Sequence, residues 1–302
     1  MNCKQLGNTA VEIPEIGLGT WDYHAGPEPL RAGIDAGALF IDTAESYGSE
    51  PIVAQAIRGI REKVFLATKV SRGHLRRAEV FEAVEQSLRR LETGWIDLYQ
   101  IHAPNPAVPL EETLDAMEEL VDAGKIRFIG VSNFHVAELE RACRAMRRYP
   151  IVSDQVRYNV ADRSIEHSTL AWCQAHHITV IAYSPLGREL QRLNDCDPHG
   201  VFSQLARETG RSMAQIALNW CLCHDGVVAI PKASSVAHVL EDCGASGWRL
   251  SAEQFSQVDK GILSRQRTGI DSLLRRLAPA WATSLLKKCL RRLPSSLRRR
   301  LN

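Results

Sequence analysis

The stretch F-I-D-T-A-E-S-Y-G, Phe40 to Gly48, decides how this chain folds and what it can do. A short apolar run ends in the carboxylate of Asp42, and the phenol of Tyr47 follows in what must be a loop. Two further β-rich runs end in the same way, V-F-L-A-T-K at Lys69 and I-D-L-Y-Q-I-H at His102. Because the carboxyl ends of parallel strands converge on one face of a β/α architecture, these four ionisable groups are expected to share a site.

Strand-like and helix-like runs alternate eight times along the chain. The candidate strands are short and rich in Val, Ile, Leu and Phe, which is typical of strands buried on both faces. They are Ile16–Gly19, Leu39–Asp42, Val64–Lys69, Ile96–His102, Phe128–Ser132, Ser153–Tyr158, Thr179–Tyr183 and Val227–Pro231. The clearest helical patterns are Ala78–Leu91, Leu110–Ala123 and Met213–Cys223, with Gly124 as a C-cap and Ser212 as an N-cap. The alternation predicts an α/β fold, a (β/α)8 TIM barrel with a parallel eight-stranded sheet.

The rival architecture is a doubly wound dinucleotide-binding fold, which would place G-x-G-x-x-G between its first strand and first helix. Here Gly17-Leu18-Gly19 is followed by Thr20, Trp21 and Asp22, without the third glycine. The barrel is therefore favoured.

Composition indicates an ordinary soluble protein. The chain has 302 residues, of which 45% are hydrophobic and 24% charged. Its amino terminus lacks the apolar stretch of a secretory signal, and no apolar run is long enough to cross a bilayer. The eight cysteines are scattered without a C-x-x-C pair, so neither a metal site nor a dithiol motif is expected. Free thiols are typical of a reducing compartment, and we expect a cytoplasmic protein.

Charge divides the chain into a barrel of residues 1–264 and a basic amphipathic helical tail of residues 265–302. Residues 269–302 carry nine basic residues and one acid, whereas the remainder carries 28 basic and 34 acidic residues. Between Ala280 and Leu293, leucines and basic residues fall on opposite sides of a helical pattern. This pattern is typical of a helix on an anionic membrane surface, but equally of a segment folded across the barrel mouth. Nucleic-acid binding is not expected, because no aromatic platform accompanies the charge.

The order Asp, Tyr, Lys, His at the strand ends resembles the catalytic tetrad of the aldo-keto reductase superfamily. Further motifs that resemble the family are G-L-G-T-W (Gly17–Trp21), G-V-S-N-F (Gly130–Phe134), D-Q-V (Asp154–Val156), A-Y-S-P-L-G (Ala182–Gly187) and I-P-K (Ile230–Lys232). The resemblance runs from about Val11 to Leu263 and leaves out the basic tail. It implies a monomeric enzyme that reduces small aldehydes and ketones to alcohols with NADPH.

The tetrad residues have complementary chemistry for this reaction. Tyr47 would give a proton to the developing alkoxide, but an isolated phenol has a pKa of about 10. The ammonium of Lys69 is expected to lower that pKa toward the working range, and Asp42 to keep Lys69 charged. His102 is expected to donate a hydrogen bond to the substrate oxygen.

The resemblance also implies a set of cofactor-binding residues. Ser132, Asn133 and Gln155 would hold the nicotinamide carboxamide, and Tyr183 would stack on the ring. The remaining positions are Gly19, Thr20 and Trp21 near the first strand, Ser184, Leu186 and Gly187 beside the pyrophosphate, Lys232, Ser234 and His238 at the adenosine 2′-phosphate, and Glu241 and Asp242 at adenine.

Two features bear on specificity. His238 stands where the family commonly has an arginine, and neutral histidine is a poor substitute for a guanidinium, so NADH is a possible second cofactor. Trp21, Ser46 and Ala103 are the expected substrate-pocket residues, and the small side chains at 46 and 103 suggest a permissive site.

A different class of function fits the same motifs. Some nicotinamide-nucleotide-binding regulatory proteins, such as the β subunits of potassium channels, resemble these reductases but turn over slowly. An intact tetrad is compatible with both functions, so a measurement of catalytic turnover is needed to distinguish an enzyme from a regulatory protein. A barrel hydrolase or lyase would need a metal cluster or paired carboxylates at strand ends, and the sequence shows neither.

Overall fold

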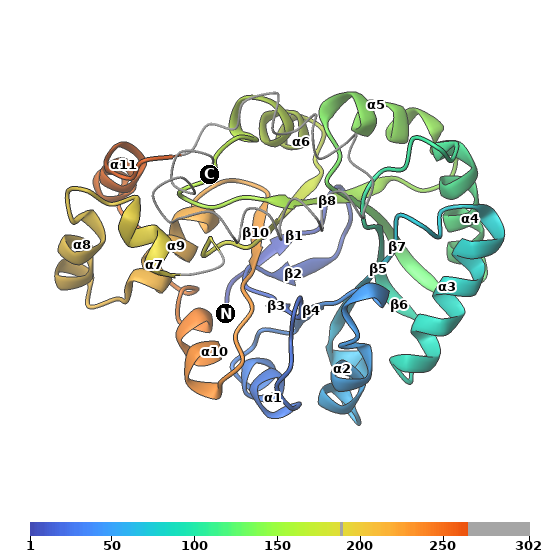
Figure 1. The fold of residues 1–302 in the computed structure, drawn as a ribbon, viewed down its shortest axis with the longest axis horizontal. Coiled ribbons are helices and arrows are strands. Elements are labelled where there is room, and N and C mark those ends of the chain that lie inside the picture. Colours follow the sequence, from blue (N-terminus) through green and yellow to red (C-terminus); the bar gives the residue numbers. More distant parts are fainter. Residues whose placement is uncertain (188–189, 265–302) are drawn as a thin grey trace, which may run out of the picture. The chain divides into compact units, whose positions relative to one another are not determined.

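The computed structural model describes residues 1–187 and 190–264, and in this part of the chain eight parallel strands form one sheet in sequence order. Helices surround the strands in Figure 1. The strands are β3 (Leu18–Gly19), β4 (Phe40–Asp42), β5 (Phe65–Val70), β6 (Ile96–Ile101), β7 (Ile126–Ser132), β8 (Ile151–Arg157), β9 (Thr179–Tyr183) and β10 (Val227–Ile230). All eight were expected from the sequence, and their bounds differ from the prediction by at most about two residues.

The sheet closes between its first and last strands. The Gly17 amide donates to the Ala229 carbonyl at 2.8 Å, and the Ala229 amide donates to the backbone carbonyl of Glu15 at 2.9 Å. Nearer the carboxyl ends of these strands, the Gly19 amide donates to the Pro231 carbonyl at 2.9 Å. These bonds leave no open sheet edge, and the predicted (β/α)8 barrel is confirmed.

The helices begin and end where local sequence dictates. Ser212 accepts a hydrogen bond from the Gln215 amide at 3.2 Å and caps α9 as predicted, and Gly124 takes a φ of 68° after α4. The helices are α1 (Glu28–Asp35), α2 (Glu50–Ile57), α3 (Arg77–Arg90), α4 (Leu110–Asp122), α5 (Val136–Ala145), α6 (Ala171–Ala175), α7 (Leu190–Asp195), α8 (Val201–Thr209), α9 (Met213–Leu222), α10 (Val236–Cys243) and α11 (Ala252–Gly261). Three short helical segments lie between these elements, η1 (Glu45–Tyr47), η2 (Arg61–Lys63) and η3 (Glu166–Leu170).

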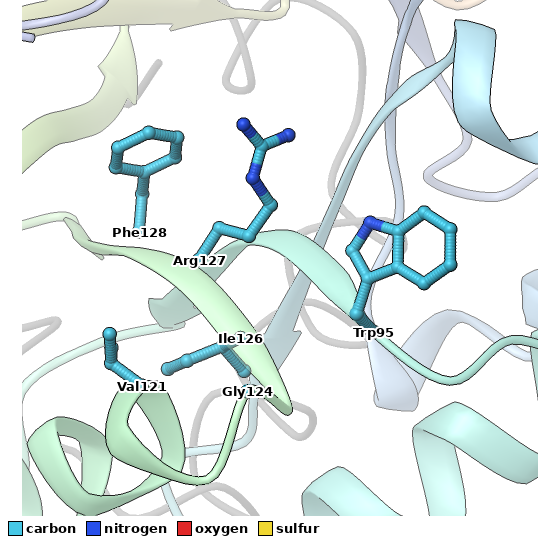
Figure 2. A pocket seen from close by; sticks show the side chains of 6 residues that line it. All are labelled: Trp95, Val121, Gly124, Ile126, Arg127 and Phe128. Carbon is cyan, nitrogen blue, oxygen red and sulfur yellow. The ribbon is translucent and has the colours of Figure 1, made fainter.

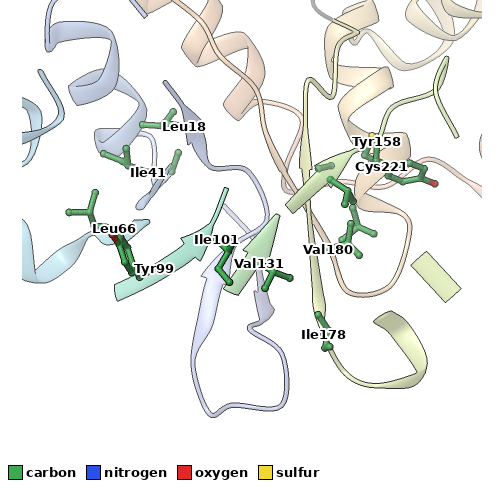
Figure 3. Packing of buried hydrophobic residues seen from close by; sticks show 14 of the residues in the cluster. Leu18, Ile41, Leu66, Tyr99, Ile101, Val131, Tyr158, Ile178, Val180 and Cys221 are labelled. Carbon is green, nitrogen blue, oxygen red and sulfur yellow. The ribbon is translucent and has the colours of Figure 1, made fainter. Parts of the chain in front are cut away.

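Strand side chains alternate between the barrel interior and the helix layer. Ile41, Leu66 and Tyr99 belong to the large cluster packed between strands and helices, part of which Figure 3 shows. Their neighbours Phe40 and Ala67 belong to a separate interior cluster. The alternation explains why the strands are apolar throughout, because both faces are buried.

A two-stranded hairpin precedes the barrel and was not expected from the sequence. It consists of β1 (Cys3–Gln5) and β2 (Glu12–Pro14), which pair antiparallel. Its Leu6 and Ile13 join the interior cluster, and the Gly7 amide donates to the Thr179 hydroxyl at the start of β9. The hairpin therefore covers the amino ends of the strands, opposite the expected site.

The predicted basic tail, residues 265–302, lies outside the described residues. Within the described ranges, no helix combines the length and apolarity needed to cross a membrane.

A substitution at Gly19 can test how closely the first and last strands of the barrel, β3 and β10, pack together at the barrel seam. A Cβ at this position would lie 2.7 Å from the Ile230 carbonyl oxygen, which is backbone and cannot rotate away. We expect Gly19→Ala to lower the free energy of unfolding by about 2 kcal/mol. Gly94→Ala is the matched control, because nothing lies within 4 Å of its added Cβ. Urea denaturation would measure both, and equal stabilities of the two variants would contradict the close approach at the seam.

Candidate active site

The structure brings the four predicted tetrad residues together at the carboxyl ends of β4, β5 and β6. Asp42 ends β4, Lys69 lies near the end of β5, and His102 directly follows β6. The Lys69 ammonium donates to Asp42 Oδ1 at 2.5 Å and lies 3.5 Å from the Tyr47 hydroxyl. That hydroxyl is also 3.5 Å from His102 Nε2, and the two rings meet edge to face. The predicted convergence of these four side chains is confirmed.

The Lys69–Asp42 ion pair is almost completely buried. Their side chains are 0% and 2% exposed. Lys69 donates a second hydrogen bond to the Thr43 carbonyl at 2.8 Å, while Asp42 Oδ2 accepts from Gln155 at 2.7 Å and Gln100 at 3.1 Å. Such a pair is tolerable in the interior because its remaining donors and acceptors are satisfied. Burial works to lower the pKa of Lys69, but Asp42 and Tyr47 hold that pKa above its ordinary value.

Gln100 is a site residue that sequence reasoning missed. It lies two residues before His102, on the same barrel-facing side of β6, and the strand period of two could have found it. Gln155 was expected at the nicotinamide, but its amide nitrogen donates to Asp42. In this structure Gln155 therefore supports the ion pair.

The expectation that Lys69 lowers the pKa of Tyr47 below its ordinary value is wrong for this structure. Burial raises the pKa of the Tyr47 phenol above its usual value, and the charge of Asp42 raises it further. Lys69 acts in the opposite direction, as predicted, but only offsets part of this effect. The largest cause is burial, which penalises the charged phenolate. Tyr47 therefore carries its proton at neutral pH, as a general acid must.

His102 is a neutral imidazole. Burial lowers the pKa of His102 to about 4, and the charge of Lys69 contributes in the same direction. A neutral ring can donate one hydrogen bond without adding charge to the site.

Glu45 is a second residue that the sequence did not single out. It lies two residues before Tyr47, and its carboxylate accepts from the Ser71 amide at 2.5 Å and contacts His74 Nδ1 at 3.0 Å. Its side chain is only 7% exposed. Glu45 therefore fastens the turn that carries Tyr47 to the loop that follows Lys69.

Three predicted cofactor positions are buried in this structure, and their contact with a cofactor stays a prediction. Gly19 is needed for the close approach of β3 and β10, as its missing Cβ shows. Thr20 is 0% exposed, and its hydroxyl donates to the Asp42 carbonyl at 3.0 Å. Asp242 is 6% exposed, and burial raises its pKa to about 7. A sequence motif identifies these positions but does not show which way each side chain faces.

The predicted nicotinamide residues form a connected network. Tyr183 donates to Asn133 Oδ1 at 3.0 Å, and Asn133 Nδ2 donates to the His102 carbonyl and to Ser132 Oγ, both at 3.0 Å. Asn133 and Ser184 hold left-handed φ angles of 62° and 49°. Non-glycine residues in this region store strain, which is common at ligand sites. The structure thus places these side chains beside the tetrad.

The remaining predicted positions lie at the surface or near it. Lys232, Ser234 and His238 are exposed, and Lys232 makes no ion pair within the described ranges. Leu186, Gly187, Glu241 and Ala103 are half-buried, Ser46 is exposed, and Trp21 is 48% exposed. These residues are accessible to a ligand.

A surface hollow of about 580 Å³ lies at the start of β7, away from the tetrad (Figure 2). It is lined by Trp95, Val121, Gly124, Ile126, Arg127 and Phe128. None of these is a tetrad or predicted cofactor residue. Among the described residues, no group of three or more His, Cys, Asp or Glu side chains could hold a metal ion.

The buried ion pair leads to a stability prediction. Asp42→Asn would leave the Lys69 charge uncompensated, so we expect a loss of about 3 kcal/mol in the free energy of unfolding. Glu85→Gln is the control, because Glu85 pairs with Lys125 at 3.1 Å and the two side chains are 44% and 39% exposed. Its loss should stay below about 1 kcal/mol. Similar losses in the two variants would show that Lys69 and Asp42 are not a buried pair.

The low pKa of His102 leads to a prediction about pH. Between its ordinary pKa of 6.5 and about 4, the unfolded chain binds a proton at His102 that the folded chain does not. Stability is therefore lost as pH falls through this window. Lowering the pH from 7 to 4.5 should destabilise the unaltered protein by about 2 kcal/mol more than His102→Gln. Parallel pH profiles of the two proteins, measured by urea denaturation, would rule out a depressed pKa.

Comparison with known proteins agrees with this geometry. The model of the aldo/keto reductase family matches residues 15–262. The methylglyoxal reductase YeaE of Escherichia coli is 38% identical over 274 residues, which span 86% of this chain and 95% of YeaE. The glyoxal reductase of Bacillus subtilis is 34% identical over 258 residues, which span 83% of this chain and 90% of that enzyme.

Solved structures show the same likeness. An aldo/keto reductase from Klebsiella pneumoniae in complex with NADP and acetate superposes with a TM-score of 0.80 at 40% sequence identity. The match covers 88% of this chain and 97% of that one. With the tetrad geometry, the family match and these relatives in agreement, the chain belongs to the aldo/keto reductase family of oxidoreductases.

Proposed function

We propose that this protein reduces aldehydes and ketones to alcohols with NADPH, and that Tyr47 is the general acid. The observation that carries the proposal is the position of the Tyr47 hydroxyl, 3.5 Å from both Lys69 Nζ and His102 Nε2. A protonated phenol between a buried ammonium and a neutral imidazole is suited to deliver a proton to a carbonyl oxygen.

The residues around the tetrad fit a nicotinamide dinucleotide. Tyr183 offers a flat ring beside Asn133 and Ser132, whose amide and hydroxyl groups can pair with a carboxamide. Lys232, exposed and without an ion-pair partner in the described ranges, fits a phosphate. The NADP complex of the Klebsiella relative supports NADPH as the cofactor. His238 replaces a guanidinium at the 2′-phosphate, so we expect some use of NADH as well.

The protein's own side chains would handle the carbonyl and its proton. His102 orients the carbonyl by a hydrogen bond to its oxygen, and Tyr47 transfers its hydroxyl proton to that oxygen. Lys69 stabilises the resulting phenolate, while Asp42 keeps Lys69 charged and fixed in place. The bound nicotinamide would supply the hydride.

Small aldehydes are the substrates that we favour. The names of the Escherichia coli and Bacillus relatives, methylglyoxal reductase and glyoxal reductase, point to reactive dicarbonyls. The small side chains of Ser46 and Ala103, one exposed and one half-buried, fit a permissive substrate pocket. A monomer suffices for this chemistry, because the whole tetrad comes from one chain.

The direct test is NADPH oxidation with methylglyoxal by the unaltered protein and by Tyr47→Phe. We expect the variant to lose about 100-fold or more in kcat, because it lacks the transferable proton, while NADPH binding is retained. Tyr149→Phe is the matched control, since the Tyr149 hydroxyl only contacts the exposed Asp122 at 2.8 Å. Tight NADPH binding without turnover of any aldehyde would contradict a reductase and favour the regulatory, nucleotide-sensing function.

A further inference from the structure

Arg157 places a guanidinium in the barrel mouth that the proposed chemistry does not use. It is the last residue of β8, and Gln155, two residues earlier on the same face, donates to Asp42 in the interior. Strand periodicity therefore directs Arg157 toward the same interior, one layer nearer the carboxyl end. On β9 its register partner is Tyr183, and the guanidinium carbon lies 5.8 Å from the centre of the Tyr183 ring.

Arg157 has no ion-pair partner among the described residues. Its Nε is buried without a hydrogen-bond partner, and the side chain forms no hydrogen bond or ion pair within residues 1–187 and 190–264. By contrast, Arg163 in the following loop donates to Asp259 Oδ1 at 2.6 Å and to the Val160 carbonyl at 2.9 Å. A buried donor that lacks a partner is expensive, so native proteins rarely keep one without a use.

Hydrogen bonds fix the residues that flank Arg157. Asn159, two residues further on, donates to the Ser184 carbonyl at 2.9 Å and joins the end of β8 to the loop after β9. Tyr183 is fixed by its bond to Asn133. Asp42, the carboxylate to which Gln155 donates, is already paired with Lys69. A ligand would therefore meet a positioned positive charge beside an aromatic ring.

We propose that Arg157 binds an anionic group, a phosphate or a carboxylate, of the ligand that occupies the barrel mouth beside Tyr183. The planar guanidinium can hold either group with two parallel hydrogen bonds. The anion could be a phosphate of the dinucleotide or a carboxylate on the carbonyl substrate. This inference rests on the proposed function, because it assumes that NADPH and a carbonyl compound enter this mouth.

The test compares Arg157→Met and Arg157→Lys with the unaltered protein. Met keeps the length of the side chain without its charge, and Lys keeps the charge without the planar fork. Arg144→Met is the matched control, because Arg144 is 71% exposed and pairs only with Glu140 on its own helix. Two quantities are measured: the Kd of NADPH by fluorescence titration, and the ratio of KM for 4-carboxybenzaldehyde to KM for benzaldehyde at saturating NADPH.

The two measurements distinguish a phosphate of the cofactor from a carboxylate of the substrate. If Arg157 binds a phosphate, Arg157→Met raises the Kd of NADPH about tenfold or more, and added salt narrows the difference. If it binds a substrate carboxylate, the KM ratio rises about tenfold or more and the Kd stays unchanged. In either case Arg157→Lys shows a smaller effect. Values for Arg157→Met within about twofold of Arg144→Met in both measurements would overturn the proposal.

Failure of the proposed reductase function can be distinguished from failure of the anion subsite. Turnover of neither aldehyde by the unaltered protein would contradict the reductase, while the anion subsite would still be judged by titration. NADPH and benzoate, each added alone to the unaltered protein and to Arg157→Met, require no turnover. Equal affinities of both proteins for both probes would then reject the subsite.

Discussion

The buried ion pair between Lys69 and Asp42 is the interaction on which the rest of the site depends. Its two charges lie on neighbouring strands, almost without exposure, and are acceptable there only because their own remaining hydrogen-bonding atoms are paired. Gln100 and Gln155 donate to Asp42, and the Thr43 carbonyl accepts from Lys69. A closed barrel can supply donors from several strands to one carboxylate, because their carboxyl ends all meet at one face.

Burial and this pair together set the protonation of the two groups that would touch a substrate. The pKa of Tyr47 is raised and that of His102 is lowered to about 4, so both are neutral across the physiological range. A neutral donor on each side of a carbonyl oxygen can stabilise charge only as it develops. In the proposed reaction, Lys69 would become most effective once Tyr47 has given up its proton, because the phenolate would then be the charge that it faces.

The barrel and the tetrad could be predicted from sequence because both depend on strand ends. Buried parallel strands leave apolar runs that are easy to recognise, and Asp42, Lys69 and His102 interrupt three of them at the same end. The hairpin β1–β2 was missed, since three-residue strands show no periodicity. The burial of Thr20 and Asp242 could not be predicted, because a position in a motif does not reveal which way a side chain faces. The pKa of Tyr47 and the lack of a partner for Arg157 follow only from the packed structure.

The central claim is that Tyr47 holds its proton at neutral pH while lying against a buried ammonium. An NMR titration of protein labelled at the tyrosine ring carbon that carries the hydroxyl would test it, with Tyr47→Phe identifying the Tyr47 signal among the six tyrosines. The structure predicts that the midpoint of this ionisation lies above the ordinary pKa of about 10, because burial raises the pKa of Tyr47. Ionisation of Tyr47 between about pH 6 and 9 would contradict the account, since the phenol would then be largely a base at its working pH.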